Sequence, residues 1–229
     1  MDFSKFEEKA GITFKDKNLL KQAFTHRSYI NENRSSNLEH NERLEFLGDA
    51  VLELVITDFL YKKFKDSAEG ELTALRSALV NADTCSIVAQ KLGANDFLLL
   101  SKGESKDNGR ARQYILANTL EALIGALYLD QEYDVAKDFI LKNIAPLTEE
   151  IINDKKWIDA KSLLQEKIQE EVGVTPTYKT MRESGPDHDK HFVVGVYAGN
   201  VLYGEGEGKS KQDAEQSAAR QALKSRGWE

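Results

Sequence analysis

The spacing of apolar and polar residues changes character about two thirds of the way along the 229-residue chain. Residues 1–145 contain no proline, and their apolar positions recur mostly at helical intervals. All three prolines and more than half of the glycines follow residue 145, where the period varies between that of a helix and that of a strand. The pattern predicts an all-helical part followed by a mixed α+β part.

The mixed part begins and ends with predicted helices and has three predicted strands between them. The first helix, residues 160–172, is amphipathic, with its apolar positions expected inward at Leu163, Leu164, Ile168 and Val172. Residues 177–183, 191–197 and 200–205 have strand character, and the second strand places Phe192, Val194 and Val196 on one face. Residues 210–225 form an alanine-rich helix, capped by Ser210. The predicted order is α-β-β-β-α.

In the helical part, the run NERLEFLGDAVLEL at residues 41–54 carries acids within an apolar helical pattern. Glu42, Glu45 and Asp49 fall within about 60° of one another around the helix. The apolar residues expected on the opposite side are Leu44, Leu47, Val51 and Leu54. Burying several carboxylates without a counter-charge costs several kcal/mol each, so they need basic partners or cations.

A second run, ILANTLEALIGALYL at residues 115–129, is apolar nearly all round. Asn118 and Glu121 are three positions apart and share a face. If the two helices pack together, Glu45, Asp49, Asn118 and Glu121 form a cluster of hard oxygen ligands that suits Mg²⁺ or Mn²⁺, not zinc. The alternative is that each acid is a salt-bridged helix residue with its carboxylate in solvent.

Composition sets limits without naming a partner. The net charge of −7 argues against nucleic-acid binding unless the cations are placed locally, and residues 159–229 hold ten Lys plus Arg against twelve Asp plus Glu. No segment has the length and apolarity of a membrane span, and MDFSKFEEKAG is unlike a signal peptide, so we expect a cytoplasmic protein. The single cysteine, Cys85, is expected to be a small core residue.

Four blocks of sequence resemble a known family. NERLEFLGDAVL at 41–52 is similar to the signature of bacterial ribonuclease III, and AFTHRSY at 23–29, EGELTALRSALV at 69–80 and ILANTLEALIGALYLD at 115–130 resemble its other blocks in order. KSLLQE, TPTYKT, GPDHDKHF and GKSKQDAEQSAARQAL resemble a double-stranded RNA-binding domain. The resemblance implies a helical catalytic domain at 1–147, a linker at 148–157 and an α-β-β-β-α RNA-binding domain at 158–227.

The resemblance also implies an activity. It implies Mg²⁺-dependent endonucleolytic hydrolysis of double-stranded RNA to 5′-phosphate and 3′-hydroxyl products with short 3′ overhangs, in processing of ribosomal RNA precursors, messenger RNA and other structured RNAs. Mn²⁺ can replace Mg²⁺, and no organic cofactor is implied. Glu45, Asp49, Asn118 and Glu121 match the metal positions. Asp49, Glu121 and Glu42 match catalytic acids, and Glu69 matches an acid near the RNA.

The family's RNA-binding residues match three elements of the C-terminal part. Gln165 and Glu166 resemble the first contact region, and His188, in the turn GPDHDK, resembles the second. The third is the start of the last helix, where positive side chains and free amides can hold phosphates; it comprises Lys209, Ser210, Lys211 and Gln212. Taken singly, each of these could equally be a solvated surface residue.

Position 118 departs from the family, which usually carries Asp there. An amide oxygen can ligate a metal, but it attracts a dication less strongly than a carboxylate does and cannot act as a base. The competing hypothesis is therefore a non-cleaving double-stranded RNA-binding protein with a metal site weakened by Asn118. Retention of the other acids favours the nuclease, with a raised Mg²⁺ requirement.

The family also implies a homodimer. The helical pattern puts Phe46 near the carboxylate face and away from the main apolar stripe, which makes it a candidate subunit contact. A lone Phe on a helix is more often a core residue, so Phe46 is weak evidence on its own.

Overall fold

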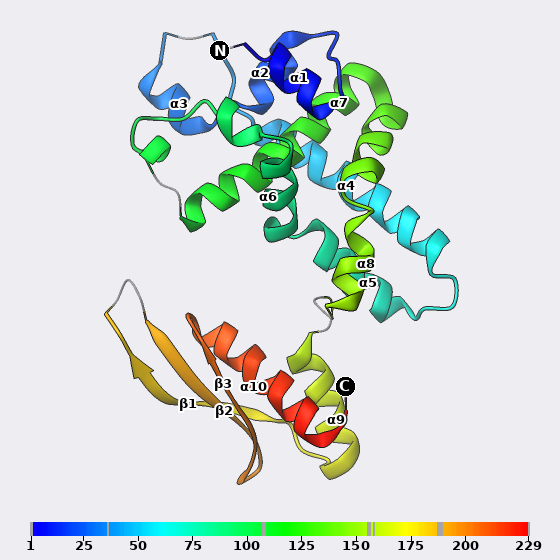
Figure 1. The fold of residues 1–229 in the computed structure, drawn as a ribbon, viewed down its shortest axis with the longest axis vertical. Coiled ribbons are helices and arrows are strands. Elements are labelled where there is room, and N and C mark those ends of the chain that lie inside the picture. Colours follow the sequence, from blue (N-terminus) through cyan, green and yellow to red (C-terminus); the bar gives the residue numbers. More distant parts are fainter. Residues whose placement is uncertain are drawn as a thin grey trace. The chain divides into compact units, whose positions relative to one another are not determined.

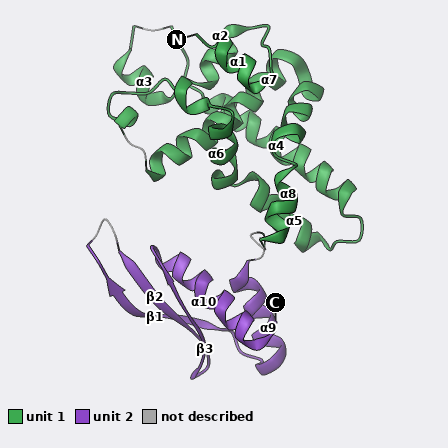
Figure 2. Ribbon diagram, viewed as in Figure 1, with its two compact units in different colours: residues 1–157 green, residues 158–229 purple. Residues whose placement is uncertain are grey.

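A computed structural model describes residues 2–35, 37–106, 109–154, 157, 159–186 and 190–228. The chain forms two compact units, Met1–Trp157 and Ile158–Glu229 (Figure 2). No helix in these described ranges is long and apolar enough to cross a membrane.

The named elements of unit 1 in its described residues are all helices, as predicted, with two long helices at its centre (Figure 1). Its elements are α1 (Ser4–Ala10), α2 (Lys17–Ala23), α3 (Arg27–Glu32), α4 (Glu42–Lys63), α5 (Glu69–Val80), α6 (Ala82–Lys91), the 3₁₀ turns Ala94–Phe97 and Glu104–Lys106, α7 (Arg110–Asn143) and α8 (Leu147–Asn153). Between residues 115 and 127, only Asn118 and Glu121 of α7 are not buried, so this helix forms the middle of the core.

Helix α4 packs along α7 and buries a stripe that is rotated around the helix from the one that the sequence predicted. Leu44 and Val51 are buried, as expected, and Leu47 is partly buried. The prediction for Leu54 was wrong, because its side chain is 57% exposed. Ten residues after Leu44, Leu54 has rotated about 80° from it around the helix, beyond the contact with α7.

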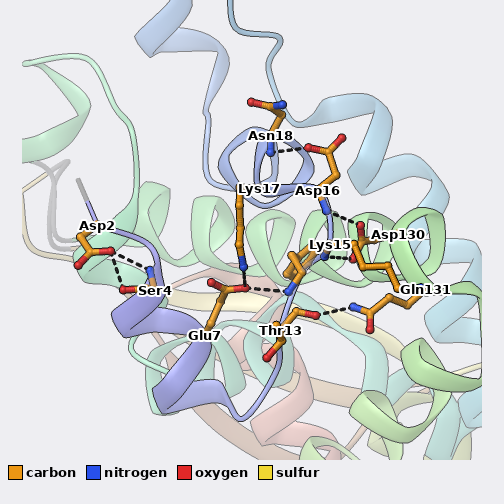
Figure 3. Close-up of polar contacts among 11 residues, drawn as sticks. Asp2, Ser4, Glu7, Thr13, Lys15, Asp16, Lys17, Asn18, Asp130 and Gln131 are labelled. Carbon is orange, nitrogen blue, oxygen red and sulfur yellow. Dashed lines mark hydrogen bonds and ion pairs between the residues drawn. The ribbon is translucent and has the colours of Figure 1, made fainter.

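Helix α7 is interrupted at Glu132, whose φ of 69° and ψ of −176° are not helical. The residues before this break are attached to the N-terminal segment (Figure 3). The Asp130 carboxylate accepts hydrogen bonds from the backbone N–H groups of Lys15 and Asp16 at 2.7 and 2.8 Å. The Gln131 side chain donates to a carbonyl of the same segment at 2.7 Å. These contacts connect α7 to the segment between α1 and α2.

The segment expected to be a linker, residues 148–157, begins as a helix. Helix α8 (Leu147–Asn153) packs against α5, and its Thr148 and Ile151 are buried. Its apolar residues belong to the core of unit 1, and the division between the two units falls after Trp157.

Unit 2 has the predicted α-β-β-β-α order, with α9 (Ala160–Val172), β1 (Thr177–Ser184), β2 (His191–Ala198), β3 (Val201–Gly208) and α10 (Lys211–Arg226). The strands form an antiparallel sheet in the order β1-β2-β3, with a register shift between Thr180 and Arg182. Both helices cover one face of the sheet (Figure 1). Phe192, Val194 and Val196 are buried on that face, as predicted.

The packing of α10 depends on glycines in β3. A Cβ added to Gly206 would lie 2.1 Å from the backbone nitrogen of Ala218, so the helix backbone rests directly on the strand. Ser210 caps α10, its Oγ accepting from the Asp213 N–H at 3.1 Å. The prediction that Val172 points inward was wrong. It is 48% exposed, because α9 ends there and the left-handed Gly173 turns the chain away.

Candidate active site

Two glycines bring α4 and α7 into backbone contact. A Cβ built on Gly48 would lie 1.7 Å from the carbonyl oxygen of Glu121, and one on Gly125 would lie 2.2 Å from that of Leu44. The sequence reasoning missed both residues. The available signal was their position inside apolar helices, where glycine costs roughly 0.5–1 kcal/mol relative to alanine and so needs a reason such as close packing.

This crossing assembles the four predicted metal-ligating residues. Glu45 and Asp49 flank Gly48 on α4, and Asn118 and Glu121 lie on the adjoining face of α7. The Asn118 side chain lies close enough to the Glu45 carboxylate to lower its pKa, against the larger effect of burial. Glu45, Asn118 and Glu121 are half-buried, whereas Asp49 is more exposed. The structure therefore brings together the four side chains that the sequence reasoning grouped, and their role as metal ligands stays a prediction.

The carboxylates of the cluster repel one another. Burial is the main cause that raises the pKa of Glu121 to about 8, and the charges of Asp49 and Glu45 raise it further. The pKa of Glu45 is raised by burial and then by Glu42, with a smaller contribution from Asp49. Partial burial, followed by Glu53, raises the pKa of Asp49. The cluster therefore lacks the positive charge that would offset the repulsion between its carboxylates.

The donor set fits a hard dication by its chemistry. It offers three carboxylates and one amide oxygen, with no sulfur or imidazole among them. In the described residues, Glu45, Asp49 and Glu121 form no ion pair with a Lys or Arg side chain. Among the described residues, no group of three or more His, Cys, Asp or Glu side chains has the geometry of a metal site.

Two further acids lie apart from this cluster. Glu42 is held by Arg27, with Nη1 3.3 Å from its Oε1, and faces Nδ1 of His40 at 3.7 Å. Glu69 begins α5, accepts a hydrogen bond from Thr73 Oγ1 at 3.0 Å, and lines a separate hollow of about 240 Å³. Glu42 adjoins the cluster through Glu45, but the structure does not place Glu69 in it.

Cys85 lies beneath the cluster on α6. Its side chain is fully buried, and Sγ is 3.6 Å from the Val80 carbonyl oxygen. Burial raises the pKa of the thiol, and the charges of Glu121 and Asp49 raise it further. The prediction of a core cysteine is confirmed.

Phe46 projects from α4 into solvent, 82% exposed. It borders a groove of about 590 Å³ whose apolar lining includes Leu19, Leu47 and Leu129. The prediction that Phe46 lies outside the apolar core stripe is confirmed.

In unit 2, the predicted RNA-binding residues lie on α9 and at the start of α10. Gln165 and Glu166 are exposed and line a shallow hollow of about 460 Å³ on α9. At the start of α10, the Lys211 ammonium lies 5.9 Å from the centre of the Phe192 ring. Lys209 and Gln212 are also exposed, with the capping residue Ser210 between them. His188 lies outside the described residues.

The chain matches two family models in succession. Residues 16–147 match the Ribonuclease-III-like family, and residues 160–226 match the Double-stranded RNA binding motif. The chain belongs to the ribonuclease III family. Like that family, it is an endoribonuclease specific for double-stranded RNA.

Similar proteins cover both parts of the chain. A Ribonuclease 3 of Protochlamydia amoebophila is 48% identical over 219 residues, which is 95% of this chain and 89% of that protein. One of Enterococcus faecalis is 46% identical over 97% of this chain and 96% of its own length. The nuclease domain of a Campylobacter jejuni ribonuclease III, described for flexibility in the region involved in its dimer formation, superposes with a TM-score of 0.56. It is 42% identical, and the match covers 63% of this chain and 99% of that one.

Proposed function

We propose that this ribonuclease hydrolyses double-stranded RNA with Mg²⁺ held by Glu45, Asp49, Asn118 and Glu121. The products would carry 5′-phosphate and 3′-hydroxyl ends with short 3′ overhangs. The observation that carries the proposal is the glycine-mediated crossing of α4 and α7, which gathers these oxygen donors without a protein cation among them. Precursors of ribosomal RNA and other structured RNAs are the substrates that the family suggests.

The residues of the proposed site have different roles. Bound Mg²⁺, or Mn²⁺ in its place, would supply an activated water and offset charge on the phosphate and the leaving 3′-oxygen. Glu121, whose pKa is raised to about 8, would have to be deprotonated to hold the dication. Asn118 offers an oxygen but cannot accept a proton. Glu42, held by Arg27, is assigned an assisting role at the dimer or substrate surface, as the family resemblance implies.

RNA recognition is assigned to unit 2. Duplex RNA exposes its 2′-hydroxyls in a wide minor groove and hides its bases in a deep major groove, so proteins read its shape. Gln165 and Glu166 on α9 suit a minor-groove contact. The start of α10, with Lys209 to Gln212, suits phosphates. The role of His188 stays a prediction from the sequence.

We also propose a homodimer in which Phe46 of each copy enters the groove beside Phe46 on the other. The phenyl ring of Phe46 is 82% exposed and borders an apolar-lined groove, and both observations support this arrangement. Each copy would then contribute one site and cleave one strand. A cytoplasmic location stays a prediction from the sequence.

The decisive experiment is cleavage of a labelled RNA duplex across Mg²⁺ and Mn²⁺ titrations. Parent protein, Asn118→Asp and Glu121→Gln are compared, with Asp58→Asn as a control because Asp58 is an acid of α4 outside the cluster. We expect metal-dependent cleavage that is lost in Glu121→Gln, kept in Asp58→Asn, and reached at lower metal concentration in Asn118→Asp. A parent that binds RNA but cuts it at no metal concentration, with cleavage restored by Asn118→Asp, would support the non-cleaving alternative.

A further inference from the structure

Arg110 and Tyr114 form an exposed pair on the first turns of α7. The Nη2 atom of Arg110 donates to the Tyr114 hydroxyl at 3.4 Å, and its guanidinium carbon is 5.8 Å from the centre of the Tyr114 ring. Arg110 is exposed, and the tyrosine is 46% exposed. The ring therefore restrains the guanidinium at the surface. Because the Arg110 side chain is already restrained, it loses less conformational entropy when it binds a ligand.

This pair lies on the same face of α7 as the metal-ligating residues. Arg110, Tyr114, Asn118 and Glu121 are spaced by four, four and three positions, which is one continuous stripe of a helix. At about 1.5 Å per residue, Tyr114 lies about 6 Å and Arg110 about 12 Å along the axis from Asn118. The stripe thus places the Arg110 cation about two helical turns from Asn118.

Arg110 has no acidic partner in the part of the chain that the structure describes, because no Asp or Glu there forms an ion pair with it. Its neighbour Arg112 is different. Arg112 is buried, and its Nη2 donates to the carbonyl oxygens of Glu104 and Ser105 at 3.0 and 3.1 Å, so it holds the segment before α7. Of these two arginines, Arg110 is the one presented to a ligand.

We propose that Arg110, braced by Tyr114, binds a backbone phosphate of the RNA strand that enters the carboxylate cluster, and thereby sets which phosphate reaches that cluster. The inference rests on the proposed function. A planar guanidinium matches two phosphate oxygens, and its charge offsets the repulsion between the acidic cluster and the RNA. Arg110 is a positioning residue, since the reacting atoms are held elsewhere.

The test uses full-length protein and a labelled RNA duplex. Binding is measured in EDTA over a series of salt concentrations, for parent, Arg110→Ala, Arg110→Lys, Tyr114→Phe and Tyr114→Ala. Lys5→Ala, an exposed cation of α1, is the matched control. We expect Arg110→Ala to bind roughly tenfold more weakly and to reduce the slope of log K against log salt by about one, as loss of one phosphate contact requires. Arg110→Lys keeps the slope, and Tyr114→Phe keeps most of the affinity.

Cleavage kinetics at saturating Mg²⁺ supply a second measurement. Loss of a positioning contact predicts a KM about tenfold higher for Arg110→Ala, a kcat within about twofold of the parent, and cuts spread over neighbouring phosphates. Thermal melts of each variant check that the fold is intact.

The outcomes separate the two proposals. Parent protein that cleaves duplex RNA, with Arg110→Ala unchanged in affinity, salt slope and cut position, overturns the role of Arg110 alone. A loss of kcat without a change in KM or slope also overturns it, because that pattern belongs to damage at the metal site. Parent protein that neither binds nor cleaves duplex RNA defeats both the proposed function and this inference.

Discussion

Gly48 and Glu121 are in direct contact through their backbones, since a Cβ on Gly48 would lie 1.7 Å from the Glu121 carbonyl oxygen. The side chain of Glu121 belongs to the acidic cluster, and Gly48 lies between Glu45 and Asp49 on the facing helix. The contact therefore sets the separation of the carboxylates from the two helices. A residue without chemistry of its own controls the geometry of the site.

Replacing Gly48 by alanine is expected to push α4 and α7 apart. The added methyl group meets backbone atoms, which cannot rotate away, so we expect a loss of roughly 3 kcal/mol in unfolding free energy, the upper end of the usual cost of overpacking. Cleavage should fall by about a hundredfold, because ligands displaced by 1 Å lose that much. Urea unfolding and cleavage rates measure both effects.

Gly70→Ala is the matched control, because a Cβ there meets nothing within 4 Å. At this exposed position in α5, alanine should be neutral or stabilising by up to about 1 kcal/mol. Equal behaviour of the two variants would show that the helix crossing does not require glycine at position 48.

If the proposed dimer forms through Phe46, Phe46→Ala should shift the protein from dimer to monomer without unfolding it, since the ring is 82% exposed within one copy. Tyr61→Ala removes another exposed aromatic residue of α4, 72% accessible, and should leave the dimer intact. Sedimentation velocity over a range of concentrations measures the association. An unchanged dimer in Phe46→Ala would remove Phe46 from the interface.

Asp159 links the stability of unit 2 to pH. It caps α9, accepting from the N–H groups of Lys161 and Ser162 at 3.0 and 3.2 Å. Burial acts to raise its pKa, but the hydrogen bonds from Ser162, Gln216 and Lys161 together outweigh burial and lower it. A carboxylate with a lowered folded-state pKa stabilises the fold above its unfolded pKa of about 3.9, and this contribution is lost as pH falls through the folded value.

Asp159→Ala should therefore cost about 1 kcal/mol at pH 7, the usual value of an N-cap, and the difference should shrink as pH drops below about 4. Asp159→Asn keeps a capping oxygen without the charge and should remove most of the pH dependence. Urea unfolding, followed by Trp228 fluorescence in a Trp157→Phe background, measures this unit. A pH-independent deficit in Asp159→Ala would contradict the role of the charge.

Glu132 has a backbone conformation that is essentially restricted to glycine, at φ 69° and ψ −176°. Glu132→Gly should relieve this strain and raise the unfolding free energy by about 1 kcal/mol. This is the net gain, because glycine also increases the entropy of the unfolded chain and so offsets part of the relieved strain. Glu132→Ala keeps the strain and serves as the comparison. Equal melting temperatures for the two variants would show that the strain contributes nothing to stability.

The elements of both units could be predicted because they depend on local periodicity and on end signals. The buried stripe Phe192, Val194 and Val196, the cap at Ser210 and the α-β-β-β-α order follow from patterns within a few residues. The outward positions of Leu54 and Val172 could not be predicted, because periodicity gives the direction of a side chain but not where the neighbouring helix or sheet ends.

By itself, the sequence determined which helix and which face each candidate ligand occupies: Glu45 and Asp49 on one helix, Asn118 and Glu121 on another. Only the tertiary structure decided how closely those faces meet, through Gly48 and Gly125, and which of two nearby arginines, Arg110 or Arg112, reaches the surface. Side-chain direction is a local property of the backbone. Close approach and exposure depend on contacts between segments far apart in the chain, and those contacts exist only in the folded protein.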